Sequence, residues 1–252
     1  GFVSGLANLK YAHKIKLINQ IRTLDADLVL LDLGAGSSYN VIDFFSMTQA
    51  GIVVTSPEPT SVVNAYEFLK NVIYRVLFRM FRNYDEVTDA LKHFSAPSSE
   101  ETAFTVEDLI AEIAKKNQWA ADNVREVCKD FDVYVIFNQA RKYNDVYLIE
   151  RLREISKKYL SLDINFGGMV FYNEEVSTSV FKMKPISILE PSSITVHSIK
   201  NIASYIMSHV IHKMTTGERL KNFNQQLSWV TSNARSDFEA NLLLQKRMQR
   251  EM

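Results

Sequence analysis

The sequence contains one cysteine, Cys128, and five histidines among its 252 residues. A single cysteine excludes an intrachain disulfide and any zinc site built from several cysteines. The histidines are scattered, and no HExxH or HxxxH spacing occurs, so they do not predict a metal site. One unpaired cysteine suits a reducing compartment, and we therefore expect a cytoplasmic protein.

Long hydrophobic runs and an excess of one charge are also lacking. No apolar run approaches the length of a membrane span, and no signal peptide is visible. Lysine plus arginine total 29, as do aspartate plus glutamate, so no overall field draws the chain to nucleic acid or to anionic lipid. Nucleic acid is therefore not an expected partner. The length allows one large domain or two small ones.

Four short apolar runs separate long segments of helical periodicity. Each run is continuous rather than alternating, which is typical of strands buried on both faces of a parallel sheet. The βα repetition predicts an α/β fold with a mostly parallel sheet flanked by helices. The four predicted strands are Leu28–Leu33, Ile52–Thr55, Val133–Phe137 and Gly168–Phe171.

Helical periodicity and capping residues predict five main helices, one of which begins with a capping-box-like pair, Thr105 and Asp108. We interpret residues 83–131 as a helical insertion between two strands. The main domain would then cover residues 1–215, with a helical tail over residues 216–252. The predicted helices are Lys10–Thr23, Thr60 to about Phe81, Val106–Lys116, Val146–Tyr159, and Ser192 or Ser193 to about Met214.

The most informative segment is LVLLDLGAGSSYNVIDFF, in which an aspartate ends the first predicted strand. A carboxylate at the end of a buried strand is costly unless something pairs with it. Asp32 is placed to act on magnesium, directly or through water. The glycines around Ala35, Gly34 and Gly36, allow the backbone to approach a terminal phosphate. The alternative is an aspartate that caps a turn, with glycines needed only for tight geometry.

Two further strand ends carry polar or rigid residues. In IVVTSPEPTSVVNAYEFLK the strand leads into the turn Pro57-Glu58-Pro59, and threonine and serine can cap the next helix. In VYVIFNQAR, Asn138 has the donors and acceptors needed to read a purine edge, and Arg141 could contact a phosphate, a ribose or a partner subunit. Plain turn geometry explains both segments as well.

Together these segments resemble the MinD/ParA family of deviant-Walker P-loop ATPases, and most closely its flagellar-placement branch, FlhG (also called FleN). The phrases DLGAGSSYNVIDFF and VVTSPEPTSVVNAYEFLK carry the resemblance, and IFNQAR and INFGGMVFYNEEVSTSVFKMKPI follow in the same order. The resemblance implies that Asp32 is the Walker B aspartate, that Gly36 belongs to the phosphate-sensing switch, that Asn138 lies near adenine, and that Arg141 lies in the neighbouring turn. Pro57 and Glu58 would lie beside the nucleotide and the dimer face.

The resemblance implies an ATPase that uses ATP and magnesium and closes into a homodimer when ATP binds. It also implies a protein partner in the flagellar or division machinery. A MinD-like tail docks on the inner face of the plasma membrane. An apolar stripe with basic neighbours is offered here by Phe238, Leu242, Leu243, Leu244, Lys246, Arg247 and Arg250. A helix that packs back on the domain or on a partner explains that stripe equally well.

The sequence departs from the family at the phosphate-binding loop, because no GxxxxGK[ST] pattern occurs. We therefore expect a partial sequence that binds ATP poorly and hydrolyses essentially none by itself. One alternative is a nucleotide-free interaction module with the same fold. A second is a ParA-like DNA-partition protein with a basic patch at Arg75, Arg79 and Arg82. A third, a cluster-assembly ATPase, is disfavoured because no CxxC pair occurs.

Overall fold

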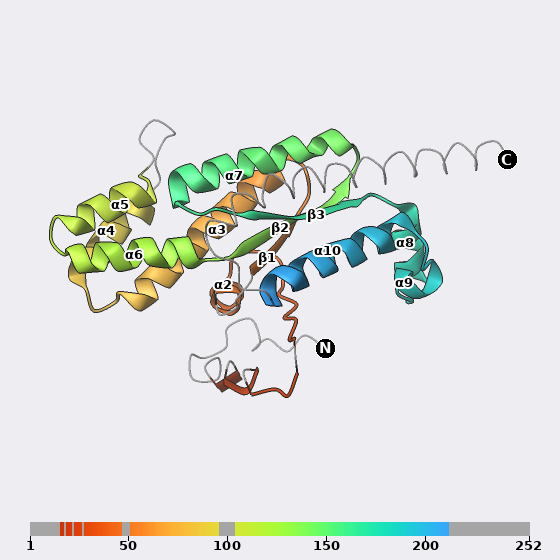
Figure 1. Ribbon diagram of the computed structural model, residues 1–252, viewed down its shortest axis with the longest axis horizontal. Helices are drawn as coiled ribbons and strands as arrows, with labels where there is room; N and C mark the ends of the chain where they lie inside the picture. The colour runs from red at the N-terminus through yellow and green to blue at the C-terminus, as the bar shows by residue number, and fades with distance from the viewer. Residues whose placement is uncertain are drawn as a thin grey trace. The chain divides into compact units, whose positions relative to one another are not determined.

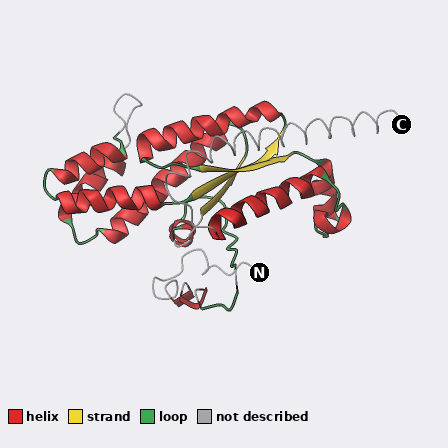
Figure 2. Ribbon diagram, viewed as in Figure 1, coloured by secondary structure: helices red, strands yellow, loops and turns green. Residues whose placement is uncertain are grey.

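The computed structural model describes residues 16, 17, 19–21, 23–26, 28–46, 51–95 and 104–211. The described residues form helices and a three-stranded sheet (Figures 1 and 2). The chain divides into two compact units, Gly1–Thr48 with Glu67–Val127 and Gln49–Tyr66 with Cys128–Met252. We call them the helical unit and the sheet unit and describe each by itself.

The sheet unit contains three parallel strands in the order β1-β2-β3. The pairing of β1 with β2 runs from Gly51 opposite Val133 to Thr55 opposite Phe137. The structure therefore confirms an α/β fold with a small parallel sheet flanked by helices, and it confirms three of the four predicted strands. Their bounds are β1 Gly51–Thr55, β2 Val133–Ala140 and β3 Asn165–Phe171.

Helices cover the sheet, and α7 and α10 lie on opposite sides of it (Figure 1). On α10, the ring of Tyr205 meets the ring of Tyr134 at 6.2 Å, and Ile202 lies directly over Gly168. On α7, Ile149 is fully buried. The other elements of this unit are η2 Tyr143–Val146, α7 Tyr147–Leu160, α8 Glu174–Phe181, α9 Ile186–Leu189 and α10 Ile194–Ile211.

The helical unit is built on the long helix α3, Pro59–Met80, which begins in the sheet unit. One apolar face of α3 is fully buried, at Leu69, Ile73 and Leu77. Each of these positions follows the one before by four residues, as expected for the core-facing stripe of an amphipathic helix. The remaining helices of this unit are α2 Tyr39–Phe45, α4 Asp85–Ser95, α5 Val106–Ala114 and α6 Gln118–Asp130.

The structure confirms the predicted start of α5. The Thr105 hydroxyl accepts a hydrogen bond from the Asp108 backbone N–H at 3.1 Å, and the Asp108 carboxylate accepts one from the Thr105 N–H at 2.9 Å. These two reciprocal bonds form a capping box, which satisfies two N–H groups that the helix itself cannot pair. Val106, immediately after the cap, is fully buried.

The prediction of a strand at residues 28–33 is wrong. These residues form neither strand nor helix, and the Leu30 side chain is 79% exposed. An apolar run becomes a buried strand only where a neighbouring strand pairs with its backbone. The three paired strands of the described residues all come from elsewhere in the chain. Asp32 therefore does not end a buried strand.

Other boundaries differ in smaller ways. Residues 16, 17 and 19–21 of the first predicted helix are helical, and the rest of that prediction lies outside the described residues. Ser193 caps α10, because its hydroxyl accepts a hydrogen bond from Val196 N–H at 3.4 Å. The predicted tail, residues 216–252, also lies outside the described residues. Helices α2, α8 and α9 were not predicted.

Candidate functional site

The carboxyl ends of β1 and β2 bring two of the predicted segments to the same edge of the sheet. The strands are parallel and adjacent, and Thr55 pairs opposite Phe137. Pro57 and Glu58, just after Thr55, and Asn138, just after Phe137, therefore lie at neighbouring strand ends. Ligands of open α/β sheets bind at this edge. The sheet unit thus assembles a candidate site from two segments that are eighty residues apart in the sequence.

The turn after β1 is fixed by hydrogen bonds to Ser61 in the first turn of α3. The Thr55 hydroxyl donates to the Ser61 carbonyl at 3.1 Å, and the Ser56 hydroxyl donates to the Ser61 hydroxyl at 2.7 Å. Glu58 N–H donates to the Ser56 carbonyl at 2.8 Å, and Pro59 then begins α3. Proline is favoured at a first helical position because it has no N–H to leave unpaired. The result is a rigid turn with the Glu58 side chain exposed.

The end of β2 contains a β-bulge. Phe137 pairs with Met169 and Ala140 with Phe171, so Asn138 and Gln139 together stand opposite one residue of β3. Gln139 adopts a positive φ of 60°, and its N–H donates to the Asn138 side-chain oxygen at 3.0 Å. A bulge bends the strand and re-aims its side chains. Both Asn138 and Gln139 are exposed, so the Asn138 amide NH₂ is available to a ligand.

The turn that follows is organised by Asp145. Its Oδ2 accepts hydrogen bonds from Arg141 N–H at 3.1 Å and from Lys142 N–H at 3.0 Å. The Arg141 guanidinium lies over the Tyr172 ring at 5.2 Å, and Tyr172 directly follows β3. This cation–π contact restricts the arginine without consuming its hydrogen-bond donors. Sequence reasoning selected Arg141 but missed both Asp145 and Tyr172, which position it.

The segment from Asp32 to Gly36 belongs to the helical unit. Asp32, Gly34, Ala35 and Gly36 are all exposed. Gly36 has a φ of 96°, which side-chain-bearing residues rarely adopt, whereas an added Cβ at either glycine would meet no heavy atom within 4 Å. Gly36 is therefore required by its backbone conformation and not by crowding.

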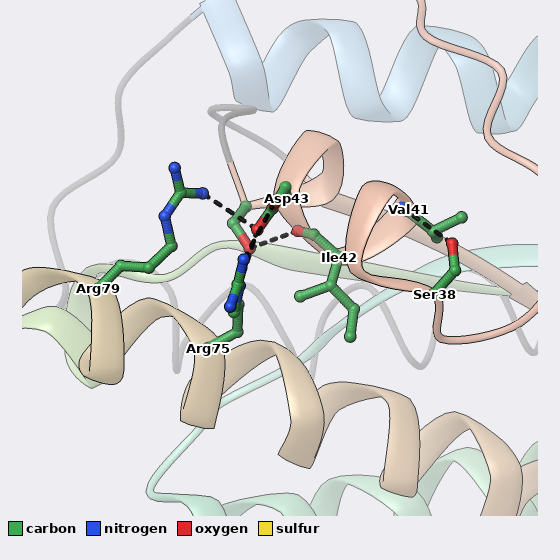
Figure 3. A network of polar contacts seen from close by, with 7 residues as sticks. Ser38, Val41, Ile42, Asp43, Arg75 and Arg79 are labelled. Carbon is green, nitrogen blue, oxygen red and sulfur yellow. Dashed lines mark hydrogen bonds and ion pairs between the residues drawn. The ribbon is translucent and has the colours of Figure 1, made fainter. Parts of the chain in front are cut away.

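Helix α2 follows this loop directly and is anchored to α3. Ser38 caps α2 through a 3.4 Å bond from Val41 N–H, and one turn later Asp43 is 2% exposed. The Asp43 carboxylate accepts hydrogen bonds from Arg75 and Arg79, as Figure 3 shows. The distances are 2.9 Å from Arg75 Nε to Oδ1, 3.4 Å from Arg75 Nη2 to Oδ2, and 3.0 Å from Arg79 Nη1 to Oδ1.

Two aromatic contacts support this ion-pair cluster. The Arg75 guanidinium lies 4.8 Å from the Tyr39 ring, and the Phe45 ring meets the Phe68 ring edge-on at 4.9 Å. The hydrogen bond to Asp43 raises the pKa of Arg75 above its ordinary value, so the guanidinium is charged throughout the physiological range. A buried carboxylate needs such partners, because removing them would leave an uncompensated charge.

Sequence reasoning missed Asp43 altogether and treated Arg75 and Arg79 as a basic patch. The available signal was an aspartate enclosed by apolar neighbours in VIDFF, together with two arginines one helical turn apart. The structure uses both arginines to neutralise Asp43. Arg82 lies beyond the last residue of α3. Two of the three arginines considered as a basic patch are therefore engaged with a buried carboxylate.

Neither a metal cluster nor a membrane span is found in the described part of the chain. No group of three or more His, Cys, Asp or Glu side chains there could hold a metal ion, and no helix there is long and apolar enough to cross a bilayer. Comparison of the chain with protein-family models and with curated proteins found no match.

Proposed function

We propose that this chain carries most of the nucleotide-binding domain of an ATP-dependent dimerisation switch of the MinD/ParA type. The observation that carries the proposal is the shared edge of β1 and β2. There the rigid Pro57-Glu58 turn and the bulged Asn138 strand end lie side by side. The sequence resemblance assigns nucleotide contacts to the same residues. The proposed role in the cell is control of flagellar number or placement, or of the division site.

Each strand-end residue has a role in the proposal that its geometry allows. Asn138 uses its oxygen on its own backbone, so its NH₂ group can donate to a ring nitrogen of adenine. Arg141, held over Tyr172, can donate to a ribose or phosphate oxygen. Glu58 lies on a rigid turn with an exposed carboxylate, which suits a contact with a partner copy.

By the sequence resemblance, the segment from Asp32 to Gly36 is proposed to be the switch. Asp32 would help to hold magnesium, and the backbone of Gly34, Ala35 and Gly36 would respond to the terminal phosphate. An exposed single carboxylate fits magnesium, because this ion is commonly held by one or two carboxylates together with phosphates and water. Bound magnesium would neutralise charge on the phosphates. The ion pairs of Asp43 hold α2 against α3. A conformational change in the loop would therefore take place next to a helix that is held in position.

The first test compares ATP binding and phosphate release by this chain with those of the product of any longer reading frame that supplies a phosphate-binding loop. We expect hydrolysis by the longer product only. Asp32→Ala should lower its rate at least about a hundredfold, as expected when electrostatic stabilisation of the reacting phosphate is lost. Asp25→Ala is the matched control, since Asp25 is another exposed aspartate of the same unit.

Three results would change the proposal. An absence of a longer frame, together with no ATP binding, would favour the nucleotide-free interaction module. Unchanged hydrolysis in Asp32→Ala would remove Asp32 from the reaction. Steeply salt-dependent DNA binding would favour the ParA-like partition protein, although Arg75 and Arg79 are already engaged with Asp43.

A further inference from the structure

An apolar protrusion follows β3 at the turn between α8 and α9. Phe181 and Met183 are each 91% exposed, and Val180 and Ile188 are 71% and 70% exposed. Met183 has a positive φ of 51°, which directs the chain sharply between the two helices. Single exposed apolar residues are ordinary, but a contiguous group of large ones marks an interaction surface.

The pattern of α8 defines the exposed face. Glu174, Ser177, Thr178 and Phe181 are exposed, whereas Ser179 is buried. Spacings of three, four and seven residues place these four side chains on one face of a helix. Small side chains in its middle would allow another helix to approach closely. The apolar end carries Phe181, and the opposite end carries Glu174.

Charge along the same face is also divided. Glu174 and Glu175 lie in the first turn of α8, and Lys182 and Lys184 follow its last residue. Glu174 and Lys182 are about 12 Å apart along the axis of α8, at 1.5 Å per residue. All four side chains are exposed. The face is therefore acidic at one end, apolar near the other, and basic beyond that.

This arrangement is complementary to itself. When two copies of α8 pack antiparallel about a two-fold axis, the acidic end of each copy faces the basic end of the other. The exposed Phe181 side chains then lie between the charged ends. An anionic membrane is less well matched, because Glu174, Glu175 and Glu190 offset the two lysines.

We infer that the face of α8 formed by Glu174, Ser177, Thr178 and Phe181, with Lys182 and Lys184 beyond its apolar end, binds a second copy of this chain through antiparallel α8 helices. A face built on one eight-residue helix is small beside the roughly 800 Å² per partner of a standard interface, so we expect a weak association. The inference does not rest on nucleotide binding. It is therefore tested without ATP, and its failure leaves the proposed function untouched.

The experiment is sedimentation of the full chain without nucleotide, at protein concentrations up to about 500 micromolar, where an interface this small can be populated. The wild type should show concentration-dependent dimers. Phe181→Ser should weaken dimerisation about thirtyfold, as for loss of a central aromatic anchor. Because Phe181 is 91% exposed, this change removes no core contact, and circular dichroism should remain that of the wild type.

A charge exchange provides the sharper test. Glu174→Lys with Glu175→Lys, and separately Lys182→Glu with Lys184→Glu, should each weaken self-association about tenfold, since like charges would face each other. An equimolar mixture of the two variants should recover dimers. Arg151→Glu with Lys157→Glu on α7 changes the net charge as the lysine variant does, and should leave association unchanged.

A chain that stays monomeric at every concentration would overturn the inference, as would dimers that persist in Phe181→Ser. Failure of the mixture to restore dimers would overturn the antiparallel arrangement. Monomeric protein that binds vesicles containing phosphatidylserine, with loss of binding in Phe181→Ser, would replace the second copy by a membrane surface.

Discussion

Arg75 binds Asp43 through two atoms, with Nε 2.9 Å from Oδ1 and Nη2 3.4 Å from Oδ2. Two helices are joined in this way, because Asp43 lies on the short helix α2 and Arg75 on the long helix α3. The Asp43 side chain is 1% exposed and the Arg75 side chain 26%. Arg79 adds a third hydrogen bond from the next helical turn. The loop that precedes α2 therefore leads into a helix that is held to α3 by these bonds.

The first prediction concerns this cluster. Replacing Arg75 by alanine removes two of the hydrogen bonds to the buried Asp43 carboxylate, and should lower the free energy of unfolding by about 3 kcal/mol. Urea unfolding followed by circular dichroism measures the change. Arg125→Ala breaks the exposed pair between Arg125 and Asp122, and should cost less than about 1 kcal/mol. Equal costs for the two variants would contradict the structural role given to Asp43.

The second prediction concerns Gly168. Its φ is 142°, and an added Cβ would lie 2.5 Å from Ile202 Cγ1. Gly168→Ala should therefore destabilise the protein by about 3 kcal/mol, from backbone strain and overpacking together. Gly167→Ala is the matched control, because its Cβ would lie 3.1 Å from Ile136 Cγ1 and no positive φ is recorded there. It should cost about 1 kcal/mol in the same urea experiment.

The sequence was sufficient to predict those elements whose signals are local. Continuous apolar runs identified β1, β2 and β3, and the pair Thr105 and Asp108 identified the start of α5. The run at residues 28–33 has the same composition as a buried strand, yet Leu30 is 79% exposed. Composition measures only the tendency to be buried, whereas pairing depends on which strands are available nearby.

Long-range features were harder to predict. The burial of Asp43 depends on two arginines more than thirty residues away, and no local pattern specifies that partnership. Helix α8 contains serine, threonine and valine, which are weak helix formers, and its start is fixed by Asn173, whose side chain accepts from Glu175 N–H at 2.9 Å. The positioning of Arg141 by Asp145 likewise required the turn geometry.

The third prediction concerns the capping box and pH. Hydrogen bonds from the Thr105 hydroxyl and backbone N–H lower the pKa of Asp108 below its ordinary 3.8. A carboxyl group whose folded pKa is lowered stabilises the fold above its unfolded pKa, and this contribution is lost as pH falls through the folded pKa. Asp108→Ala should therefore cost about 1 kcal/mol near pH 6, and progressively less below about pH 4.

Urea unfolding of wild type and Asp108→Ala at several pH values measures this difference. Glu86 and Asp89 also have lowered pKa values, so both proteins should lose stability in acid and only their difference reports on Asp108. Glu126→Gln, on the exposed face of α6, should cost little stability. A cost for Asp108→Ala that is the same at about pH 3 as at about pH 6 would contradict the prediction.

The last prediction tests the base-reading role proposed for Asn138. The Asn138 oxygen is oriented by Gln139 N–H at 3.0 Å, so its NH₂ group points away from its own backbone as a donor. Asn138→Asp keeps the acceptor and removes that donor. In the longer product it should weaken ATP binding about tenfold, which corresponds to about 1.4 kcal/mol, as measured by calorimetry.

Asn138→Ala should weaken ATP binding similarly and reduce discrimination against GTP, because both substitutions remove the group that distinguishes purine edges. Asn123→Ala, on α6, should change neither property. If ATP affinity survives both Asn138 variants while Asp32→Ala still abolishes hydrolysis, the switch stands and a different residue reads the base.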